Sequence, residues 1–373
     1  MSPLRVLGSD VVAQILISLS RPEILDVQQA IGKSLVDFST GKEREYQPDA
    51  GVVRRPDGQK TLFRSFTSPT AVGAKIIVDP APVPIFNNPD TQVHHGILAL
   101  CDNQGIPTGI INAAEVTGYR TSMSTMIPYM WRRNTKNVVV FGSGKQALWH
   151  VRLALALRGS EIESITVVNR SEERAKSMLK QLKEENQQYW ESPYVSRYLG
   201  PSLSDYDSQL EKAVSVADVI FCTVPSRKPL FPLHYMAKAT EGGRYPFVSA
   251  IGSWQLDMIE LDPNMLRYVV KSRHGYNSQS NVSGLIIVDN RDEVLHTGEF
   301  SQSNMSPEQT VELGEVLQWR KTSSSENKRL TAWLYDGFVI YKSVGVGSTD
   351  LACGNALLAI AAKRGLGVSI PDF

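Results

Sequence analysis

One short stretch, residues 138–150, constrains the fold more than any other part of the sequence. It reads VVVFGSGKQALWH: an apolar run typical of a buried strand, two glycines separated by one residue, and then an amphipathic segment. Gly142 permits a tight turn, Gly144 lets a ligand approach the backbone, and Ala147 lets helix and strand pack closely. The stretch therefore predicts a site for the pyrophosphate of a dinucleotide at a helix N-terminus. The residues expected there are Gly142, Ser143, Gly144, Lys145 and Gln146.

The surroundings of this turn favour a ligand over the alternative, a strand-to-helix turn that holds nothing. Strands and helices alternate after it, with short apolar strands at SITVVNR (164–170), VADVIFCTV (216–224), YPFVSAIG (245–252) and LIIVDN (285–290). Fully apolar strands that alternate with helices are typical of a parallel sheet covered on both faces. We therefore expect a Rossmann-type, doubly wound α/β domain that binds NAD(P) over residues 131–329.

The end of the second strand separates two cofactors. NAD sites place an acidic residue there for the ribose 2′-hydroxyl, whereas NADP sites supply a cation for the 2′-phosphate. In ITVVNRSEER that position is Asn169, followed by Arg170 and Ser171, with Arg174 one turn later. The missing acid predicts NADP(H) in preference to NAD(H), although an arginine here can also be an ordinary surface residue. Later strand ends add further residues to the expected cofactor site: Thr223, Val224, Pro225, Ser226 and Gly252.

The part of the chain before this domain has a different pattern. Strand-forming segments follow one another closely at 60–66, 72–80 and 96–112, and DNQG within the last is a hairpin turn signal. This predicts an antiparallel meander, and we expect the tail from Leu330, with its final helix, to fold back onto it. The expected second domain is thus an α+β substrate-binding and dimerisation domain made of residues 1–130 and 330–373.

Charge, hydropathy and metal-ligating residues exclude several classes of protein. The 39 basic and 38 acidic side chains leave a net charge of +1, so neither nucleic acid nor a membrane surface is an expected partner. The apolar runs are shorter than the ~20 residues of a membrane span, and the first residues lack a signal-peptide pattern, so the expected location is the cytoplasm. The histidines and the three cysteines show no metal-binding spacing, so no metal is expected.

Segments spread over residues 45–352 resemble the ornithine cyclodeaminase and mu-crystallin family in order and spacing. They are VGAKIIVDP, VTGYRTSMSTM, VVVFGSGKQA, VVNRSEERA, ADVIFCTVPS, IGSWQLDMIEL, TGEF, ELGEVL and YKSVGVGSTD. The Arg-Thr pair before the glycine turn and the Lys-Ser-x-Gly near the end are the most specific, since neither belongs to Rossmann domains in general.

The resemblance implies roles for several residues. Lys75 matches the family's active-site lysine, and a cation within the apolar run VGAKIIV is costly unless it reaches a polar cleft. The alternative is a lysine on the solvated face of an edge strand. Arg120 matches the carboxylate-binding arginine, with Thr121 beside it for substrate or cofactor phosphate. Asp350 matches an acidic residue near the active site, although it can equally cap the final helix.

Two departures from the family bear on the substrate. Cyclodeaminases carry an acid shortly after the glycines of the fifth strand, and here Trp254 takes that place, with Asp257 three residues later. This resembles the ketimine reductase and amino-acid dehydrogenase branches. The family's first carboxylate-binding arginine, upstream of the lysine strand, is also missing from its usual place. Arg54, Arg55 and Arg64 lie nearby, and Arg64 stands where relatives tend to have an apolar residue.

The resulting expectation is an NADPH-dependent reductase of the C=N bond in a cyclic ketimine or imino acid, or the reverse dehydrogenation of an amino acid. Lys75 and Arg120 are the expected catalytic residues, and Lys75, Arg120, Thr121, Arg64, Trp254 and Asp350 the expected substrate-binding residues. One alternative is a cyclodeaminase of ornithine or a relative that uses bound NAD. Another is a crystallin-like protein that binds NADP without turnover. The family resemblance also implies a homodimer.

Overall fold

The computed structural model describes residues 3–81, 95–271, 276, 284–321, 325–371 and 373. They form two compact units: residues 1–120 with 346–373, and residues 121–345. The predicted boundaries were at 130 and 330, and the structure moves both. The helix α3 (Ala113–Tyr129) continues across the first boundary, and the strand β14 (Val339–Lys342) pairs within the second unit. The tail therefore joins the first unit only from Val346.

The first unit is built on a seven-stranded, mostly antiparallel sheet in the order β15-β1-β6-β5-β4-β3-β2. Its strands are β1 (Leu4–Leu7), β2 (Gly51–Arg54), β3 (Lys60–Thr67), β4 (Ala71–Asp79), β5 (His95–Asp102), β6 (Pro107–Asn112) and β15 (Val368–Ile370). The predicted meander is confirmed for β3 to β6. The sequence pattern did not predict β1, which pairs with β6 in parallel and with β15 antiparallel.

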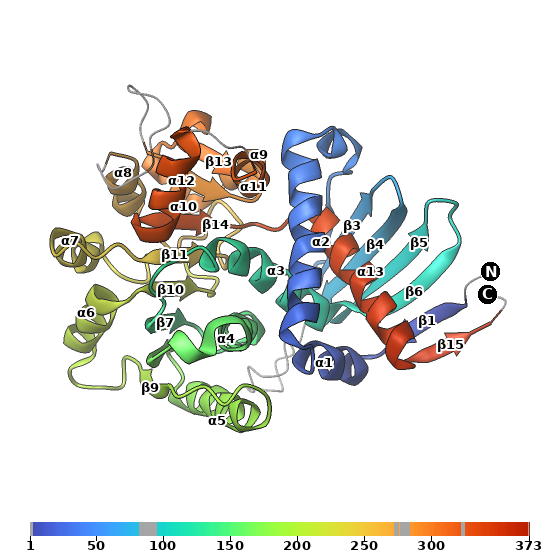
Figure 1. The fold of residues 1–373 in the computed structure, drawn as a ribbon, viewed down its shortest axis with the longest axis horizontal. Helices are drawn as coiled ribbons and strands as arrows, with labels where there is room; N and C mark the ends of the chain where they lie inside the picture. The colour runs from blue at the N-terminus through green and yellow to red at the C-terminus, as the bar shows by residue number, and fades with distance from the viewer. Residues whose placement is uncertain (1–2, 82–94, 272–275, 277–283, 322–324, 372) are drawn as a thin grey trace. The chain divides into compact units, whose positions relative to one another are not determined.

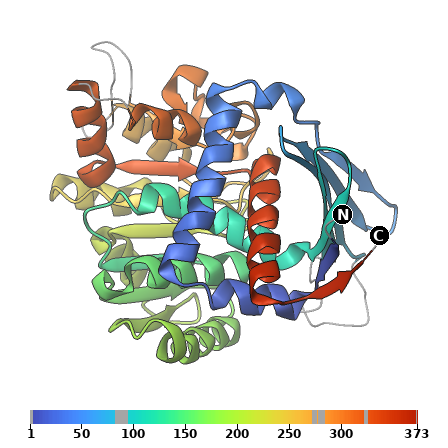
Figure 2. The same cartoon turned by 45° about the vertical axis from the view of Figure 1, so that its right-hand side comes forward.

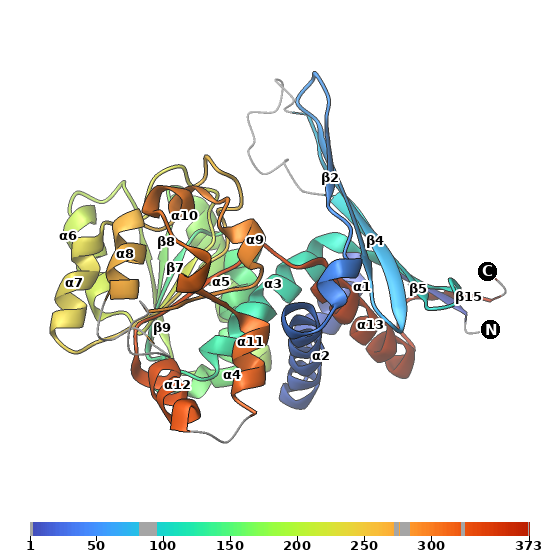
Figure 3. The ribbon, with the colours of Figure 1, turned by 90° about the horizontal axis from the view of Figure 1, so that it is seen from above.

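Helices cover one face of this sheet. They are α1 (Ser9–Ile17), α2 (Arg21–Thr40) and α13 (Gly347–Arg364), and a 3₁₀ turn at Glu43–Tyr46 follows α2. Figure 3 shows the sheet nearly edge-on with these helices on the same side, and in Figure 2 α2 and α13 lie side by side. Gly354 permits this packing, because a Cβ there would lie 2.8 Å from the side chains of Leu98 and Leu100. The close approach places the first turn of α13 against β3 and β4.

The second unit has an eight-stranded sheet in the order β13-β12-β14-β11-β10-β7-β8-β9, in which every strand pair is parallel. Its other strands are β7 (Asn137–Phe141), β8 (Ser164–Val168), β9 (Val195–Leu199), β10 (Val219–Cys222), β11 (Phe247–Ala250), β12 (Ile286–Val288) and β13 (Thr310–Glu312). The predicted Rossmann-type fold is therefore confirmed (Figure 1).

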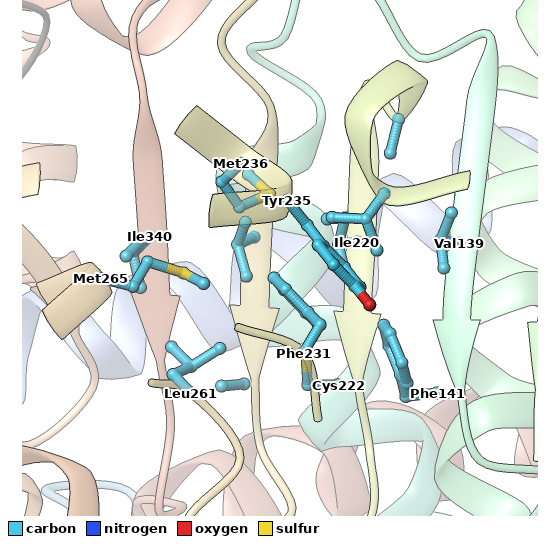
Figure 4. Close-up of a cluster of buried hydrophobic side chains, with 14 of the residues drawn as sticks. Val139, Phe141, Ile220, Cys222, Phe231, Tyr235, Met236, Leu261, Met265 and Ile340 are labelled. Atoms are coloured by element: carbon cyan, nitrogen blue, oxygen red, sulfur yellow. The ribbon is translucent and has the colours of Figure 1, made fainter. Parts of the chain in front are cut away.

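The helices of this unit connect the strands and cover both faces of the sheet. They are α4 (Lys145–Arg158), α5 (Glu172–Tyr189), α6 (Tyr206–Val216), α7 (Leu233–Glu241), α8 (Pro263–Lys271), α9 (Arg291–Val294), α10 (Gly298–Ser303), α11 (Leu313–Trp319) and α12 (Ser325–Asp336), with 3₁₀ turns at Gly159–Glu161 and Pro307–Gln309. Figure 4 shows part of the core, where Phe141 of β7 and Ile220 of β10 lie near Tyr235, and Ile340 of β14 lies near Met265. This apolar layer holds the strand ends, and the loops that follow them, in fixed positions.

Candidate functional site

A buried ion cluster lies in the first unit. The Lys75 ammonium is 2.6 Å from Asp350 Oδ2, and the Arg120 Nε is 3.2 Å from the other carboxylate oxygen, Oδ1. Lys75 and Arg120 are 2% and 6% exposed, and Asp350 is fully buried. Each oxygen of one carboxylate thus accepts from a different cation. Three of the residues predicted from the sequence meet here.

The local folding explains why these side chains meet. Lys75 lies on β4, an interior strand between β3 and β5, on the face that α13 covers. This excludes the alternative of a lysine on the solvated face of an edge strand. The helix α13 begins at Gly347, with Val346 at its N-cap, so Asp350 is already inside the helix. The alternative of a capping role for Asp350 is therefore wrong.

Arg64 belongs to the same neighbourhood. It is the residue of β3 directly opposite Lys75 in the antiparallel register. A Cβ added at Gly347, in the first turn of α13, would lie 3.4 Å from the Arg64 Cδ, so the arginine stem packs against that turn. By contrast, Arg54 and Arg55 are exposed at the hairpin between β2 and β3. Of the arginines weighed from the sequence, the structure brings Arg64 to the cluster.

The residues of this cluster shift one another's pKa values. Lys75, Arg120 and Arg64 act electrostatically on one carboxylate, Asp350. Burial, with Arg120 and Arg64, lowers the pKa of Lys75 to about 8, although Asp350 raises it. Burial alone would raise the pKa of Asp350, but Arg120 and Lys75 hold it below its ordinary value. Arginine forks suit a carboxylate, so a cluster that holds two arginines and a lysine is chemically suited to bind one.

The glycine turn of the second unit has the shape that the sequence predicted. Gly142 has a φ of +111°, and its N–H donates to the carbonyl of Val168 over 2.8 Å. A Cβ there would lie 2.8 Å from the Thr223 Oγ1, so the position requires glycine. Gly144 is the N-cap of α4, and nothing lies within 4 Å of where its Cβ would be. Ala147 is fully buried against the strand.

This geometry fits a dinucleotide pyrophosphate. The open space at Gly144 lies at the helix N-terminus, where the backbone N–H groups of the first turn and the helix dipole favour an anion. Ser143, Lys145 and Gln146 complete the turn and the first residues of α4. The residues present are therefore suited to hold the phosphates of such a cofactor.

The end of β8 carries no acidic side chain. The side chain of Asn169 forms a hydrogen bond within its own loop: its Nδ2 donates to the carbonyl of Ser171 over 2.8 Å. The Ser171 hydroxyl accepts from the Arg174 N–H over 3.3 Å and caps α5. The side chains of Arg170 and Arg174 are exposed at this loop. Asn169 thus stands where NAD sites place an acid, and Glu172 and Glu173 follow only in the first turn of α5.

The loops after β10 and β11 hold the remaining predicted cofactor residues. The Thr223 N–H and hydroxyl both donate to the Phe141 carbonyl, over 3.1 and 2.7 Å, so this loop is fixed to the end of β7. Pro225 and Ser226 follow in the same loop, and Gly252 follows β11. Trp254, two residues after Gly252, is 46% exposed, whereas Thr121 is buried on α3.

Sequence reasoning missed a second buried ion cluster, formed by Glu260, Glu299 and Lys342 beside Ser253. Lys342 lies 3.1 Å from the Glu299 Oε1, and both side chains are fully buried. The sequence does hold a sign of this cluster. As with Lys75, a lysine adjoins an apolar strand, here in GFVIYK, where Lys342 is the last residue. The motifs TGEF and YKSVG were noted for the family resemblance alone.

The described residues offer neither a metal site nor a membrane-spanning helix. Within the described ranges, no group of three or more His, Cys, Asp or Glu side chains is arranged to hold a metal ion, and His94 lies outside those ranges. Among the described helices, none is long and apolar enough to cross a membrane.

Comparisons with known proteins agree with the fold. Residues 129–248 match the Shikimate / quinate 5-dehydrogenase family model, which covers the part of the second unit from the end of α3 to β11. An archaeal alanine dehydrogenase dimer with bound NAD has a TM-score of 0.71 at 20% identity, covering 99% of both chains. The Thermococcus litoralis Delta(1)-pyrroline-2-carboxylate reductase, in complex with NADH and L-proline, has a TM-score of 0.72 at 16% identity, covering 98% of this chain and 100% of that one.

Two relatives are similar in sequence over most of their length. The Delta(1)-pyrroline-2-carboxylate reductase of Bacillus cereus is 26% identical over 307 residues, which cover 80% of each chain. An uncharacterized cyclodeaminase of Dictyostelium discoideum is 24% identical over 280 residues, which cover 71% of this chain and 70% of that one. Fold and site thus define a two-unit, dinucleotide-binding α/β protein. The chain is similar to a Delta(1)-pyrroline-2-carboxylate reductase and a cyclodeaminase, which agrees with the resemblance of its motifs to the ornithine cyclodeaminase and mu-crystallin family.

Proposed function

We propose that the protein is an NADPH-dependent reductase of the C=N bond in a cyclic ketimine or imino acid that carries a carboxylate. The observation that carries this proposal is the gathering of three basic side chains, Lys75, Arg120 and Arg64, around the buried Asp350. Arginine and lysine side chains held together in this way suit a substrate carboxylate. The relatives named as reductases of Delta(1)-pyrroline-2-carboxylate support this class of substrate.

Each residue of the cluster has a separate task in this proposal. Arg120 binds the substrate carboxylate through its planar guanidinium, with Arg64 as a second cation in place of the family's first arginine. Asp350 holds Lys75 and Arg120 in place through its two oxygens. Lys75 fixes the carboxylate or passes a proton toward the imine nitrogen, because its pKa of about 8 lies near neutrality. Thr121 and Trp254 belong to the second unit, and their part in substrate binding stays a prediction from the sequence.

The cofactor belongs to the second unit. A nicotinamide dinucleotide supplies the hydride that reduces the imine carbon. The glycine turn at Gly142 and Gly144 binds the pyrophosphate, and the loop with Arg170 and Arg174 binds the 2′-phosphate that distinguishes NADP(H). The absence of an acid at Asn169 supports this preference. The solved relatives carry NAD or NADH, so the preference is a property proposed for this chain.

A spectrophotometric screen tests the proposal. Purified protein should oxidise NADPH faster than NADH when given Δ1-pyrroline-2-carboxylate or Δ1-piperideine-2-carboxylate. Absence of turnover with every cyclic and linear imino acid, in both cofactors, would overturn the proposed function.

A cyclodeaminase is the second candidate, and the relative named as an uncharacterized cyclodeaminase favours it. This reaction releases ammonia from ornithine or lysine without net change in NAD(H). Trp254 at the place of the cyclodeaminase acid argues for the reductase. Ammonia release at constant absorbance at 340 nm would decide for the second candidate.

A homodimer through the first unit's sheet completes the proposal. Phe63, Ile76 and Ile97 are paired across neighbouring strands on the face opposite Lys75. Phe63 and Ile97 are 46% and 45% exposed, which is unusual for large apolar side chains that adjoin one another on a sheet. Light scattering should give twice the chain mass of 41.3 kDa.

A further inference from the structure

The second ion cluster lies where β10, β11 and β14 end. Glu260, Glu299 and Lys342 are each fully buried, and they come from the loop after β11, from α10 and from the last residue of β14. In a doubly wound sheet, ligands bind outside the carboxyl ends of the strands, where the strand order reverses. This cluster is therefore on the side of the sheet that also carries the glycine turn.

Glu260 connects two strand-end loops through their backbones. Its Oε1 accepts from the Val224 N–H over 2.9 Å, in the loop after β10. Its Oε2 accepts from the N–H groups of Gly252 and Ser253, over 2.7 and 3.1 Å, in the loop after β11. A single buried carboxylate thus accepts three backbone N–H groups and fixes the spacing of the two loops.

The two loops are also in direct contact. A Cβ added at Gly252 would lie 2.4–2.5 Å from the backbone atoms of Val224, so the loops pack backbone against backbone. Any change in the direction of Glu260 must move one loop against the other, because there is no side chain between them to adjust.

Lys342 and Glu299 hold the same region from the other side. The Lys342 ammonium donates to the Ser253 carbonyl and, over 2.5 Å, to the Ser253 hydroxyl. That hydroxyl in turn donates to Glu299. The N–H, the carbonyl and the hydroxyl of Ser253 are therefore each held by a hydrogen bond to a buried residue of this cluster.

We propose that Glu260 is a positioning residue for the nicotinamide half of the dinucleotide. The glycine turn after β7 serves the pyrophosphate, while the loops at Val224 and Gly252 follow the strands of the second half of the fold, where the nicotinamide half binds. Glu260 sets the shape of both loops without touching the cofactor. The inference rests on the proposed dinucleotide-dependent function and names Glu260 as a residue on which cofactor binding depends.

Calorimetric titration of the full chain with two ligands tests the inference. NADP⁺ carries the nicotinamide, and 2′-phospho-ADP-ribose lacks it but keeps both the pyrophosphate and the 2′-phosphate. Glu260→Gln replaces one accepting oxygen with a donor that faces a backbone N–H. The variant should raise the Kd of NADP⁺ by about tenfold, the effect of losing one charge-assisted hydrogen bond, and leave that of 2′-phospho-ADP-ribose within about twofold. An equal change for both ligands, or no change, would overturn the inference.

Glu312→Gln is the matched control. Glu312 is 1% exposed and also accepts a backbone N–H, from Arg291 over 2.8 Å, but it lies on β13 at the far edge of the same sheet. Both Kd values should stay at the wild-type level in this variant. Loss of affinity for NADP⁺ alone in Glu312→Gln would mean that any buried glutamate of the sheet has this effect, which contradicts a specific role for Glu260.

A measurement on the wild type keeps the inference testable if Glu260→Gln does not fold. Burial, together with the charge of Glu299, raises the pKa of Glu260 to about 7, while Lys342 lowers it. The thiol of Cys222, the other titratable group near them, has its pKa raised well above its ordinary value by burial and stays neutral. Below pH 7, a protonated Glu260 accepts less well. The preference for NADP⁺ over 2′-phospho-ADP-ribose should therefore shrink between pH 8 and 6, and a constant ratio would contradict the inference.

These titrations contain no imine. A protein that reduces no imino acid but shows the selective loss in Glu260→Gln refutes the proposed reaction and supports the positioning role. If the wild type reduces imino acids and Glu260→Gln binds both ligands as the wild type does, the proposed reaction is supported and the positioning role of Glu260 is refuted.

Discussion

The ammonium of Lys75 lies 2.6 Å from the Asp350 Oδ2, in an ion pair whose side chains are 3% and 0% exposed. The two residues are 275 positions apart in the sequence, on β4 and on the first turn of α13. The pair therefore joins the sheet of the first unit to the helix that covers it, and it also sets the charge of the proposed substrate site.

Removing the carboxylate should destabilise the protein. Asp350→Asn leaves Lys75 and Arg120 buried without their anion, and breaking a buried ion pair in this way costs about 3 kcal/mol. The free energy of unfolding, measured in urea, should fall by about that amount. In the control, Asp336→Asn, the exposed pair with Arg133 is lost, and the change should stay below about 1 kcal/mol because the pair is solvated. Equal losses in the two variants would show that the Asp350 pair has no special role.

The pH dependence of turnover should report Lys75. The lysine is charged below its pKa of about 8 and neutral above it. As the pH rises through 8, the site loses one positive charge and kcat/KM should fall. Asp350 raises the pKa of Lys75, so Asp350→Asn should move this fall to lower pH, whereas Lys75→Arg should move it to higher pH. A profile that all three proteins share would exclude Lys75 as its cause.

The choice between cofactors should depend on the loop after β8. Arg170→Ser removes a cation where the 2′-phosphate is proposed to bind, so the KM for NADPH should rise by about tenfold, as for one charged hydrogen bond. The KM for NADH should change little, because NADH has no phosphate there. Steady-state kinetics with both cofactors checks this, and a parallel rise for NADH would mean that Arg170 serves the loop rather than the phosphate.

A buried histidine should make the protein less stable in acid. Burial lowers the pKa of His150 from 6.5 to about 4, although the Gln146 carbonyl raises it. Below pH 6.5 the His150 side chain binds a proton in the unfolded chain but not in the folded chain. The free energy of unfolding therefore decreases as the pH is lowered, by about 2 kcal/mol at pH 5. His150→Gln lacks this contribution. Its free energy of unfolding should drop less between pH 7.5 and 5 than that of the wild type, and equal drops would show that His150 does not titrate as expected.

Local sequence patterns predicted the glycine turn because every requirement for it is local. The apolar strand, Gly142 in a left-handed conformation and Gly144 at the helix N-terminus all lie within a few residues. The lysine in VGAKIIV could be singled out for the same reason, since a charge in an apolar strand needs a partner. The class of fold followed from the alternation of strands and helices in one half and the closely spaced strands in the other.

The partners of those residues depend on long-range packing, which local patterns do not contain. Asp350 meets Lys75 because Gly354 brings α13 onto the sheet, and a capping role was equally consistent with the sequence. Arg64 could not be separated from Arg54 and Arg55 without the register that places it opposite Lys75. The domain boundary moved for a related reason: β14 completes the parallel sheet between β11 and β12, although it follows them both in the chain.

The central claim is that the cation cluster in the first unit binds a substrate carboxylate. It is tested most directly by comparing Δ1-pyrroline-2-carboxylate with 1-pyrroline, the same ring without the carboxylate, in the wild type and in Arg120→Leu. The account predicts that the wild type loses at least about 100-fold in kcat/KM without the carboxylate, and that Arg120→Leu loses less than about tenfold. Equal kcat/KM for the two substrates in the wild type, or the same ratio in the variant, would contradict it.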